Sequence, residues 1–254
     1  MFMLSLEMIP IIILAFVCEL VDSTLGMGYG TTLTPIMLAL GFEPIEIVPA
    51  VLCSEAITGV LAGVFHHEFG NVDLRRGTHD RKIAMVMTGF SVVGVILATI
   101  IAINVPSWAI KIYIGVLVLA LGLVILFNKK KDFPFSWKRI AGLGALAAFN
   151  KGISGGGYGP VVTAGQVLSG VRGRKAVGIT SLAEGITSIV GFGIYLYSGV
   201  SLNTSLLISL MIGAVISVPI SAYIVSRLPA GKLTYIIGGV STALGGYTLV
   251  RLFL

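Results

Sequence analysis

Long apolar runs follow one another along the chain and are separated by short polar segments. Six of them are long enough to cross about 30 Å of hydrocarbon as continuous helices. These runs cover 44–66, 82–104, 106–127, 173–198, 203–226 and 229–253. A membrane β-barrel would instead alternate apolar and polar positions within short segments. The pattern therefore predicts an all-α polytopic membrane protein.

Two other apolar runs are interrupted at glycine-rich segments. The first covers 10–40 and is cut at 22–30, which reads D-S-T-L-G-M-G-Y-G. The second covers 137–168 and is cut at 150–159, which reads N-K-G-I-S-G-G-G-Y-G. The pieces between breaks have about 11 to 13 residues, roughly half a membrane at 1.5 Å per residue. Because glycine permits tight turns and positive φ, each cut predicts a helix break at membrane depth.

The two interrupted runs are copies of one design, since identical residues recur 129 positions apart without a gap. The identical pairs are Gly26/Gly155, Gly28/Gly157, Tyr29/Tyr158, Gly30/Gly159, Thr34/Thr163, Gly41/Gly170, Val48/Val177, Glu55/Glu184, Ile57/Ile186, Thr58/Thr187 and Gly70/Gly199. We therefore predict two membrane repeats, 1–132 and 133–254, within one integral membrane domain. A duplicated, glycine-interrupted apolar segment is the best sequence indication of a secondary transporter's binding site.

The basic residues indicate how the repeats are oriented. Of the 17 Lys and Arg residues, all but three lie in four loop clusters, at 75–82, 129–139, 172–175 and 227–232. These clusters share one side only if each glycine break is the tip of a hairpin that re-enters its own side of the membrane. Each half then crosses the membrane three times, so the second half is inverted. This topology predicts that both termini are extracytoplasmic. The three exceptions are Lys111, Lys151 and Arg251.

Each hairpin tip begins a new half-helix, near Thr31 and at Pro160. The free N–H groups and the positive dipole end of a half-helix attract anions. Two such ends, meeting near the bilayer centre, predict a site for a small anion. The alternative is close helix packing by small residues. The predicted substrate-binding residues are Gly26, Gly28, Tyr29, Gly30, Thr31, Lys151, Ser154, Gly155, Gly157, Tyr158 and Gly159.

Ionisable residues inside apolar segments are costly unless they find a partner or a wet cavity. Four carboxyls are of this kind, Glu19, Asp22, Glu55 and Glu184, together with Lys151. Lys151 occupies the repeat position of Asp22, so it could pair with that carboxylate or provide positive charge for the substrate. All four carboxyls could carry coupling protons or shape the site. The repeat mates Glu55 and Glu184 could shape it by bonding the N–H groups of the glycine turns.

An enzyme is not expected. Ser154 lies in a G-x-S-G pattern like that of rhomboid intramembrane proteases, but such a serine needs a base within hydrogen-bond reach. The three histidines lie at or in one loop, outside the spanning helices. His66 and His67, placed where an apolar run meets that loop, have no third ligand at metal-binding spacing. We expect no metal, no cofactor and no ATP-binding motif.

The motifs resemble the TauE/SafE sulfite exporter family, also called the four-toluene-sulfonate uptake permease family. The features of the first half are G-M-G-Y-G, the following T-x-x-T-P, the P-A-V-x-x-S-E helix and the G-N-V-D run at 70–73. The second half carries G-G-G-Y-G-P and T-S-L-x-E. Tyr29 and Tyr158 replace a glycine found in many relatives, and N-V-D is missing after Gly199. The resemblance implies passage of sulfite, thiosulfate, sulfate or organosulfonates through a bacterial or archaeal inner membrane.

These observations predict a secondary transporter that moves a small sulfur-containing anion, coupled to protons, by alternating access. A passive anion channel is the alternative, and a protease using Ser154 is a remote one. The expected partners are the substrate anion, the lipid bilayer, protons and further copies of the chain. The net charge of +6 is explained by the topogenic loops, so nucleic acid is not expected as a partner.

Overall fold

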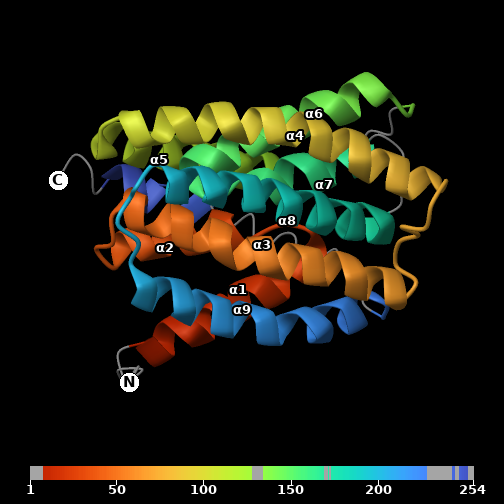
Figure 1. Ribbon diagram of the computed structural model, residues 1–254, viewed down its shortest axis with the longest axis horizontal. Coiled ribbons are helices and arrows are strands. Elements are labelled where there is room, and N and C mark those ends of the chain that lie inside the picture. The colour runs from red at the N-terminus through yellow and green to blue at the C-terminus, as the bar shows by residue number, and fades with distance from the viewer. Residues whose placement is uncertain are drawn as a thin grey trace.

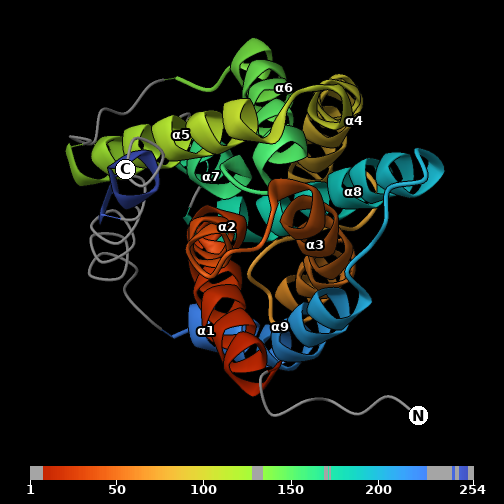
Figure 2. The ribbon, with the colours of Figure 1, turned by 90° about the vertical axis from the view of Figure 1, so that its left-hand side faces the viewer.

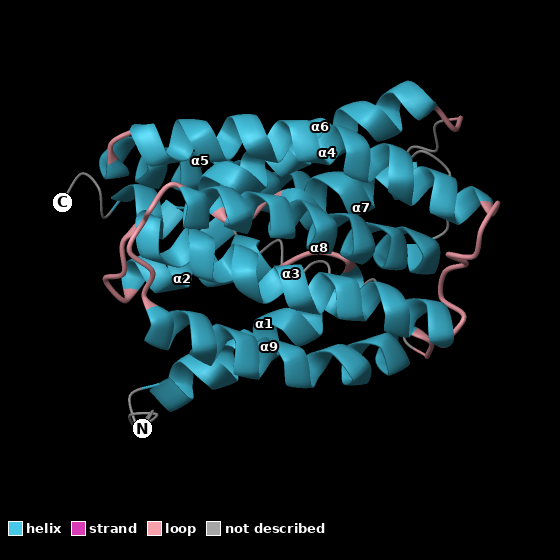
Figure 3. Ribbon diagram, in the orientation of Figure 1, coloured by secondary structure: helices cyan, strands magenta, loops and turns pink. Residues whose placement is uncertain are grey.

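The computed structural model describes residues 8–127, 134–168, 171, 173–227, 242–243 and 246–250. Within them every regular element is a helix (Figure 3), which confirms the predicted all-α class. The elements are α1 (Ile9–Leu25), α2 (Tyr29–Ala39), α3 (Pro44–Glu68), α4 (His79–Asn104), α5 (Ser107–Phe127), α6 (Trp137–Ser154), α7 (Tyr158–Leu168), α8 (Gly173–Tyr197) and α9 (Thr204–Val225). The last predicted run, 229–253, lies mostly outside the described residues.

Four of the described helices, α3, α4, α8 and α9, are long and apolar enough to cross a membrane. They match four of the six predicted spans. Ser107–Ala120 within α5 is a shorter apolar helix. Large apolar side chains on the outer faces of these helices are exposed, among them Phe90, Leu97 and Ile216. Such a surface suits lipid rather than water, as expected of a multi-pass membrane protein.

Local sequence signals fix where several spans begin. In α3 the side chains and backbones of Glu43 and Glu46 form a reciprocal capping box, with Pro44 at the first helical position. Thr78 caps α4 by accepting from the Arg81 amide, and Asn203 caps α9 in the same way. These caps satisfy amides that the helix itself leaves free, so the loop-to-membrane boundaries are encoded locally.

The first glycine break is narrower than the sequence analysis expected. α1 remains helical through Leu25, so the segment 22–24 does not interrupt it. The hydroxyl of Ser23 donates to Glu19, four residues earlier, and the hydroxyl of Thr24 donates to the backbone of Leu20. These polar side chains therefore find partners within the helix and need not break it. The turn begins at Gly26, whose φ is 69°.

The second break is also shorter than the sequence predicted. α6 continues through Ser154, so the segment 150–152 is helical, and the chain turns at Gly155 with φ 72°. Gly28 and Gly157 also have positive φ, 135° and 79°. In both copies the positive φ angles fall on glycines, which adopt them without strain. In the first copy Met27 also lies outside the helices, between Gly26 and Gly28.

The two hairpins enter the bundle from opposite ends. In Figure 1, α1 runs from the left of the view to the middle and α2 returns leftward, whereas α6 runs inward from the right and α7 returns rightward. The loop 69–78, which carries basic residues, lies at the right, and the loop 198–203, which has none, lies at the left. Each interrupted run therefore turns back on itself.

Each hairpin packs against a spanning helix from the other half of the chain. α1 lies beside α9, and α6 lies beside α4 (Figure 2). One buried apolar cluster joins α1, α2, α3 and α9, and a second joins α4, α6, α7 and α8. This exchange ties the two halves together and leaves the turns of the hairpins between the two clusters.

The helices α3 and α8 cross closely where both have glycine. A Cβ added to Gly59 would lie 2.7 Å from the Cα of Gly185, and one added to Gly185 would lie 2.5 Å from the Val60 nitrogen. No side chain fits at such distances, so the backbones meet directly. Glu55 is one helical turn before this crossing and Glu184 is next to it, so the crossing brings the two carboxyls to one place.

Candidate functional site

The first tip, Gly26–Gly30, and the second tip, Gly155–Gly159, are in direct contact. The hydroxyl of Thr163 donates to the carbonyl of Gly26 at 2.6 Å, and the amide of Gly157 donates to the hydroxyl of Thr31 at 3.1 Å. Each hairpin therefore supplies a threonine that bonds to the backbone of the other. The sequence predicted that the turns lie close together, and the structure confirms it.

The tip backbones approach so closely that no side chain could separate them. A Cβ on Gly30 would overlap the carbonyl group of Gly155, and a Cβ on Gly159 would overlap the carbonyl group of Gly26. Both glycines lie in the first turn of their half-helices. Glycine is needed at these two positions for space, which is a separate requirement from the positive φ at Gly26 and Gly155.

Some backbone amides at the tips already donate hydrogen bonds to side chains of the protein. The amide of Tyr29 donates to Asp22 Oδ1 at 3.0 Å, and the amide of Gly156 donates to the Ser154 hydroxyl at 3.1 Å. Asp22 therefore bonds an N–H group of the glycine turn, a role that the sequence had suggested for Glu55 and Glu184. Among the described residues, amides in the first turns of α2 and α7 have no protein acceptor, including those of Gly30, Thr31, Tyr158 and Gly159.

The two tip tyrosines brace the turns. Tyr29 and Tyr158 are buried, and their hydroxyls bond to Ser54 of α3 at 3.0 Å and to Ser91 of α4 at 2.9 Å. A buried phenol needs such a partner. In this conformation the tyrosine rings anchor the tips to neighbouring helices. Their part in substrate binding stays a prediction.

Lys151 lies between two carboxylates. Its ammonium pairs with Glu55 of α3 and, at 2.7 Å, with Glu184 of α8, and its side chain is fully buried. The pairing with Asp22 suggested by the repeat position is not what the structure has. The reason is reach, because the flexible four-carbon stem extends from the end of α6 to the α3–α8 crossing, where two carboxyls gather. Asp22 bonds to the tip amide instead.

A small cavity adjoins this ion pair. Its volume is about 10 Å³, which accommodates about one water molecule. The lining residues are Glu19, Asp22, Ser23, Glu55, Thr58, Gly59, Ser181 and Glu184. We call Glu19, Asp22, Glu55 and Glu184 the carboxyl cluster. The structure thus brings together all five ionisable residues that the sequence analysis selected.

Ser154 contacts only backbone atoms among its hydrogen-bond partners in the described structure. Its hydroxyl bonds to the carbonyls of Asn150, at 2.8 Å, and Gly156, at 3.1 Å, and accepts from the Gly156 amide. None of these partners is a general base, so the arrangement is that of a residue that closes a helix end. The geometry gives no support to the protease alternative.

Similarity to known proteins assigns the chain to a family. The profile of the family described as sulfite exporter TauE/SafE matches residues 11–248, nearly the whole chain. The chain belongs to the TauE/SafE family. It is also 31% identical to a Bacillus subtilis (strain 168) protein described as the probable membrane transporter protein YtnM, over 95% of this chain and 83% of that relative. Membership makes the chain a membrane transporter of this family, as the motifs predicted.

A buried polar link below the first tip of this TauE/SafE protein was not expected from its sequence. The position of His66 next to a loop predicted a place at the membrane interface, but the side chain is fully buried. The amide nitrogen of Asn71 donates to His66 Nδ1 at 3.1 Å, so Nε2 carries the proton and donates to the carbonyl of Ser23 at 3.0 Å. Asn71 also donates to Ala222 of α9. The sequence feature that could have indicated this link is the polar Gly70-Asn71 turn directly after α3.

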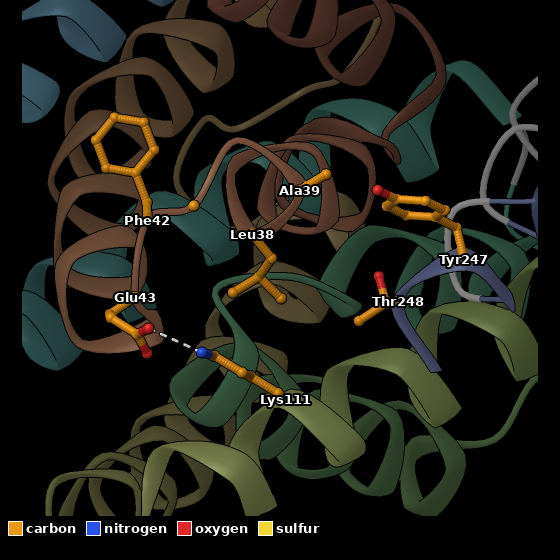
Figure 4. A pocket seen from close by; sticks show the side chains of 8 residues that line it. Leu38, Ala39, Phe42, Glu43, Lys111, Tyr247 and Thr248 are labelled. Carbon is orange, nitrogen blue, oxygen red and sulfur yellow. Dashed lines mark hydrogen bonds and ion pairs between the residues drawn. The ribbon is translucent and has the colours of Figure 1, made fainter. Parts of the chain in front are cut away.

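A larger pocket, of about 260 Å³, opens at the far end of α2. Figure 4 shows Leu38, Ala39, Phe42, Glu43, Lys111, Tyr247 and Thr248 around it. Lys111, one of the three basic residues outside the loop clusters, pairs with Glu43 at 2.8 Å. The bonds from Lys111 and Ser107 lower the pKa of Glu43. At neutral pH the Lys111 ammonium in this pocket is therefore paired with the ionised carboxylate of Glu43.

Proposed function

We propose that this chain is a secondary transporter of a small sulfur-containing anion, namely sulfite, thiosulfate, sulfate or an organosulfonate. It acts in the cell (inner) membrane by alternating access coupled to protons. The observation that carries the proposal is the contact of two duplicated half-helix tips beside a buried lysine. An anion there meets free amides and, once a glutamate leaves Lys151, a positive charge.

The contacts between the tips support an inverted repeat. Gly26 lies against Thr163, and its repeat mate Gly155 lies against Thr34, so exchanging one copy for the other maps one contact onto the other. The approach of Gly30 to Gly155 has the corresponding counterpart in Gly159 and Gly26. Reciprocal contacts of this kind are what a pseudo-two-fold axis produces. We infer that the axis lies in the membrane plane and that both termini are extracytoplasmic.

An anion can enter the proposed site only after a conformational change. The free amides of the two half-helices face a tight tip-to-tip contact, and Lys151 is occupied by Glu55 and Glu184. Because the adjoining cavity holds about one water, a sulfur oxyanion enters only when the tips separate. The anion then replaces a glutamate on Lys151. We infer that the described conformation is closed and that rocking of one half against the other opens it.

The transport assay uses purified protein in liposomes. We expect counterflow of labelled sulfite or thiosulfate, and accumulation that follows an imposed pH gradient, because the carboxyl cluster exchanges protons during the cycle. Arg75→Gln is the matched control, since its exposed pair with Asp73 lies in a loop, and it should transport as the unaltered protein does. Flux that ignores the pH gradient would favour a passive channel. Absence of flux for all four anion classes would refute the proposal.

Inverted topology is tested by cysteine accessibility in a variant without native cysteines. Lys130→Cys and Arg174→Cys should react with a membrane-impermeant reagent only from the cytoplasmic face, and Ser201→Cys only from the outer face. The reason is that basic loops are retained in the cytoplasm. Labelling of positions 130 and 174 from opposite faces would contradict the hairpin topology.

A further inference from the structure

The carboxyl cluster has more acidic groups than its basic partner can neutralise. Lys151 is the one basic side chain that the described structure pairs with these four carboxyls, and it bonds only Glu55 and Glu184. Asp22 accepts from the amide of Tyr29. Glu19 differs from the other three, because one oxygen accepts from Ser23 at 2.6 Å while Oε2 has no partner.

A second unpartnered oxygen lies on the same cavity. Thr58 is buried, its Oγ1 has no hydrogen-bond partner, and it lines the cavity together with Glu19. Buried polar atoms almost always have partners. Two unpartnered oxygens around a space of about 10 Å³ meet the requirement for a bound water, namely a polar site with room for one molecule and at least two partners.

The surroundings of Glu19 are dominated by negative charge. Asp22 follows on α1, Glu55 approaches from α3 and Glu184 from α8. Other titratable groups near these elements are Cys18 on α1, Tyr29 on α2 and the neutral His66 on α3. The adjacent α9, Thr204–Val225, has no carboxyl, lysine or histidine in its sequence. Among the described elements, the positive charge comes from Lys151 of α6, and it is already shared.

We propose that Glu19 is the residue that carries the coupling proton, and that it exchanges this proton through one water held between its Oε2 and the hydroxyl of Thr58. A proton on Oε2 removes the one carboxylate charge that has neither a cation nor an amide against it, and supplies a donor for the water. Glu55 and Glu184 are then counter-ions of Lys151 and not proton carriers. The biological meaning of this assignment rests on the proposed transport function.

The assignment gives a simple coupling step. When Glu19 is ionised, its carboxylate adds negative charge beside Lys151 and repels an entering anion. When a proton from bulk water reaches Oε2 through the bound water, that charge is lost, and an anion can replace a glutamate on Lys151. After the anion leaves, the proton returns to bulk water by the same route, so one proton moves between bulk water and a carboxyl and no covalent bond between heavy atoms forms or breaks.

The first test is independent of any substrate. Infrared difference spectra of the purified protein between about pH 6 and pH 9, where exposed carboxyls with pKa values of about 4 stay ionised, should contain a C=O stretching band of a protonated carboxyl. We expect Glu19→Gln to remove this band, and the matched variants Glu55→Gln and Glu184→Gln to retain it. Thr58→Val should keep the band but shift its frequency, because the hydroxyl bonds the water. Survival of the band in Glu19→Gln, or its loss in Glu55→Gln, would overturn the assignment.

The second test separates this assignment from the proposed function. In liposomes, Glu19→Gln should lose accumulation driven by a pH gradient to a greater extent than counterflow, whereas the loop control Arg75→Gln should retain both. If the unaltered protein moves no sulfur anion, the proposed function fails while the infrared result still decides the proton site. If sodium chloride, but not choline chloride, abolishes the carboxyl band, the cavity is a sodium site and the proton assignment is wrong.

Discussion

Lys151→Met is expected to abolish transport and to destabilise the protein more than any other single change near the tips. The ammonium is fully buried and pairs with Glu55 and Glu184. Its removal leaves two buried carboxylates without a cation, and breaking a buried pair in this way costs about 3–5 kcal/mol. Thermal unfolding in detergent, followed by size-exclusion chromatography, measures the loss of stability, and the liposome assay measures transport.

A compensated variant separates stability from function. Lys151→Met combined with Glu55→Gln and Glu184→Gln removes the cation together with both of its counter-ions, so most of the stability should return. Transport should not return, because the proposed anion partner is still missing. If the compensated variant transported sulfite normally, Lys151 would be a structural residue and the proposed binding role would be wrong.

The location of the candidate site was predictable because the sequence contains the glycine motif of the tips twice, at 26–30 and 155–159. Duplicated glycine segments fixed the tips, and the rule that buried ionisable residues need partners selected Glu19, Asp22, Glu55, Lys151 and Glu184. These features depend on local composition and spacing, which a single sequence contains. The structure brings all five side chains to one place, beside the contact between the tips.

The pairing within the site could not be predicted, because it depends on how helices cross. The backbone contact of Gly59 with Gly185 brings two carboxyls together, and neither glycine is the repeat mate of the other. Lys151 therefore pairs with residues from two helices instead of with the carboxyl at its own repeat position. The burial of His66 is of the same kind, since it depends on Asn71 and α9 covering the end of α3.

The exact limits of the helix breaks were also beyond the sequence. Polar residues at 22–24 and 150–152 suggested wider interruptions, but serine and threonine can bond within their own helix. Ser23 and Thr24 do so, and Lys151 reaches its carboxylates without leaving α6. Whether a polar residue ends a helix depends on the partners that the fold offers, and a single chain does not show them in advance.

Gly30→Ala is expected to disable the transporter through a contact of backbone with backbone. Gly30 lies in the first turn of α2 and does not have positive φ, so alanine is compatible with the local helix and would favour it by up to about 1 kcal/mol. The added Cβ, however, would overlap the carbonyl group of Gly155. A main-chain carbonyl cannot rotate away as a side chain can, so the tips must separate, at a cost of about 1–3 kcal/mol or more.

The matched control for this substitution is Gly193→Ala in α8, where a Cβ meets nothing within 4 Å. It makes the same chemical change in a helix, and we expect it to leave unfolding temperature and transport unchanged or slightly raised. Gly30→Ala should instead lower the unfolding temperature and reduce counterflow of labelled sulfite. Because both variants have the same helix propensity, the difference between them measures the tip contact alone. Equal behaviour of the two variants would mean that the tips do not meet in the working protein, and the proposed anion site between them would lose its structural basis.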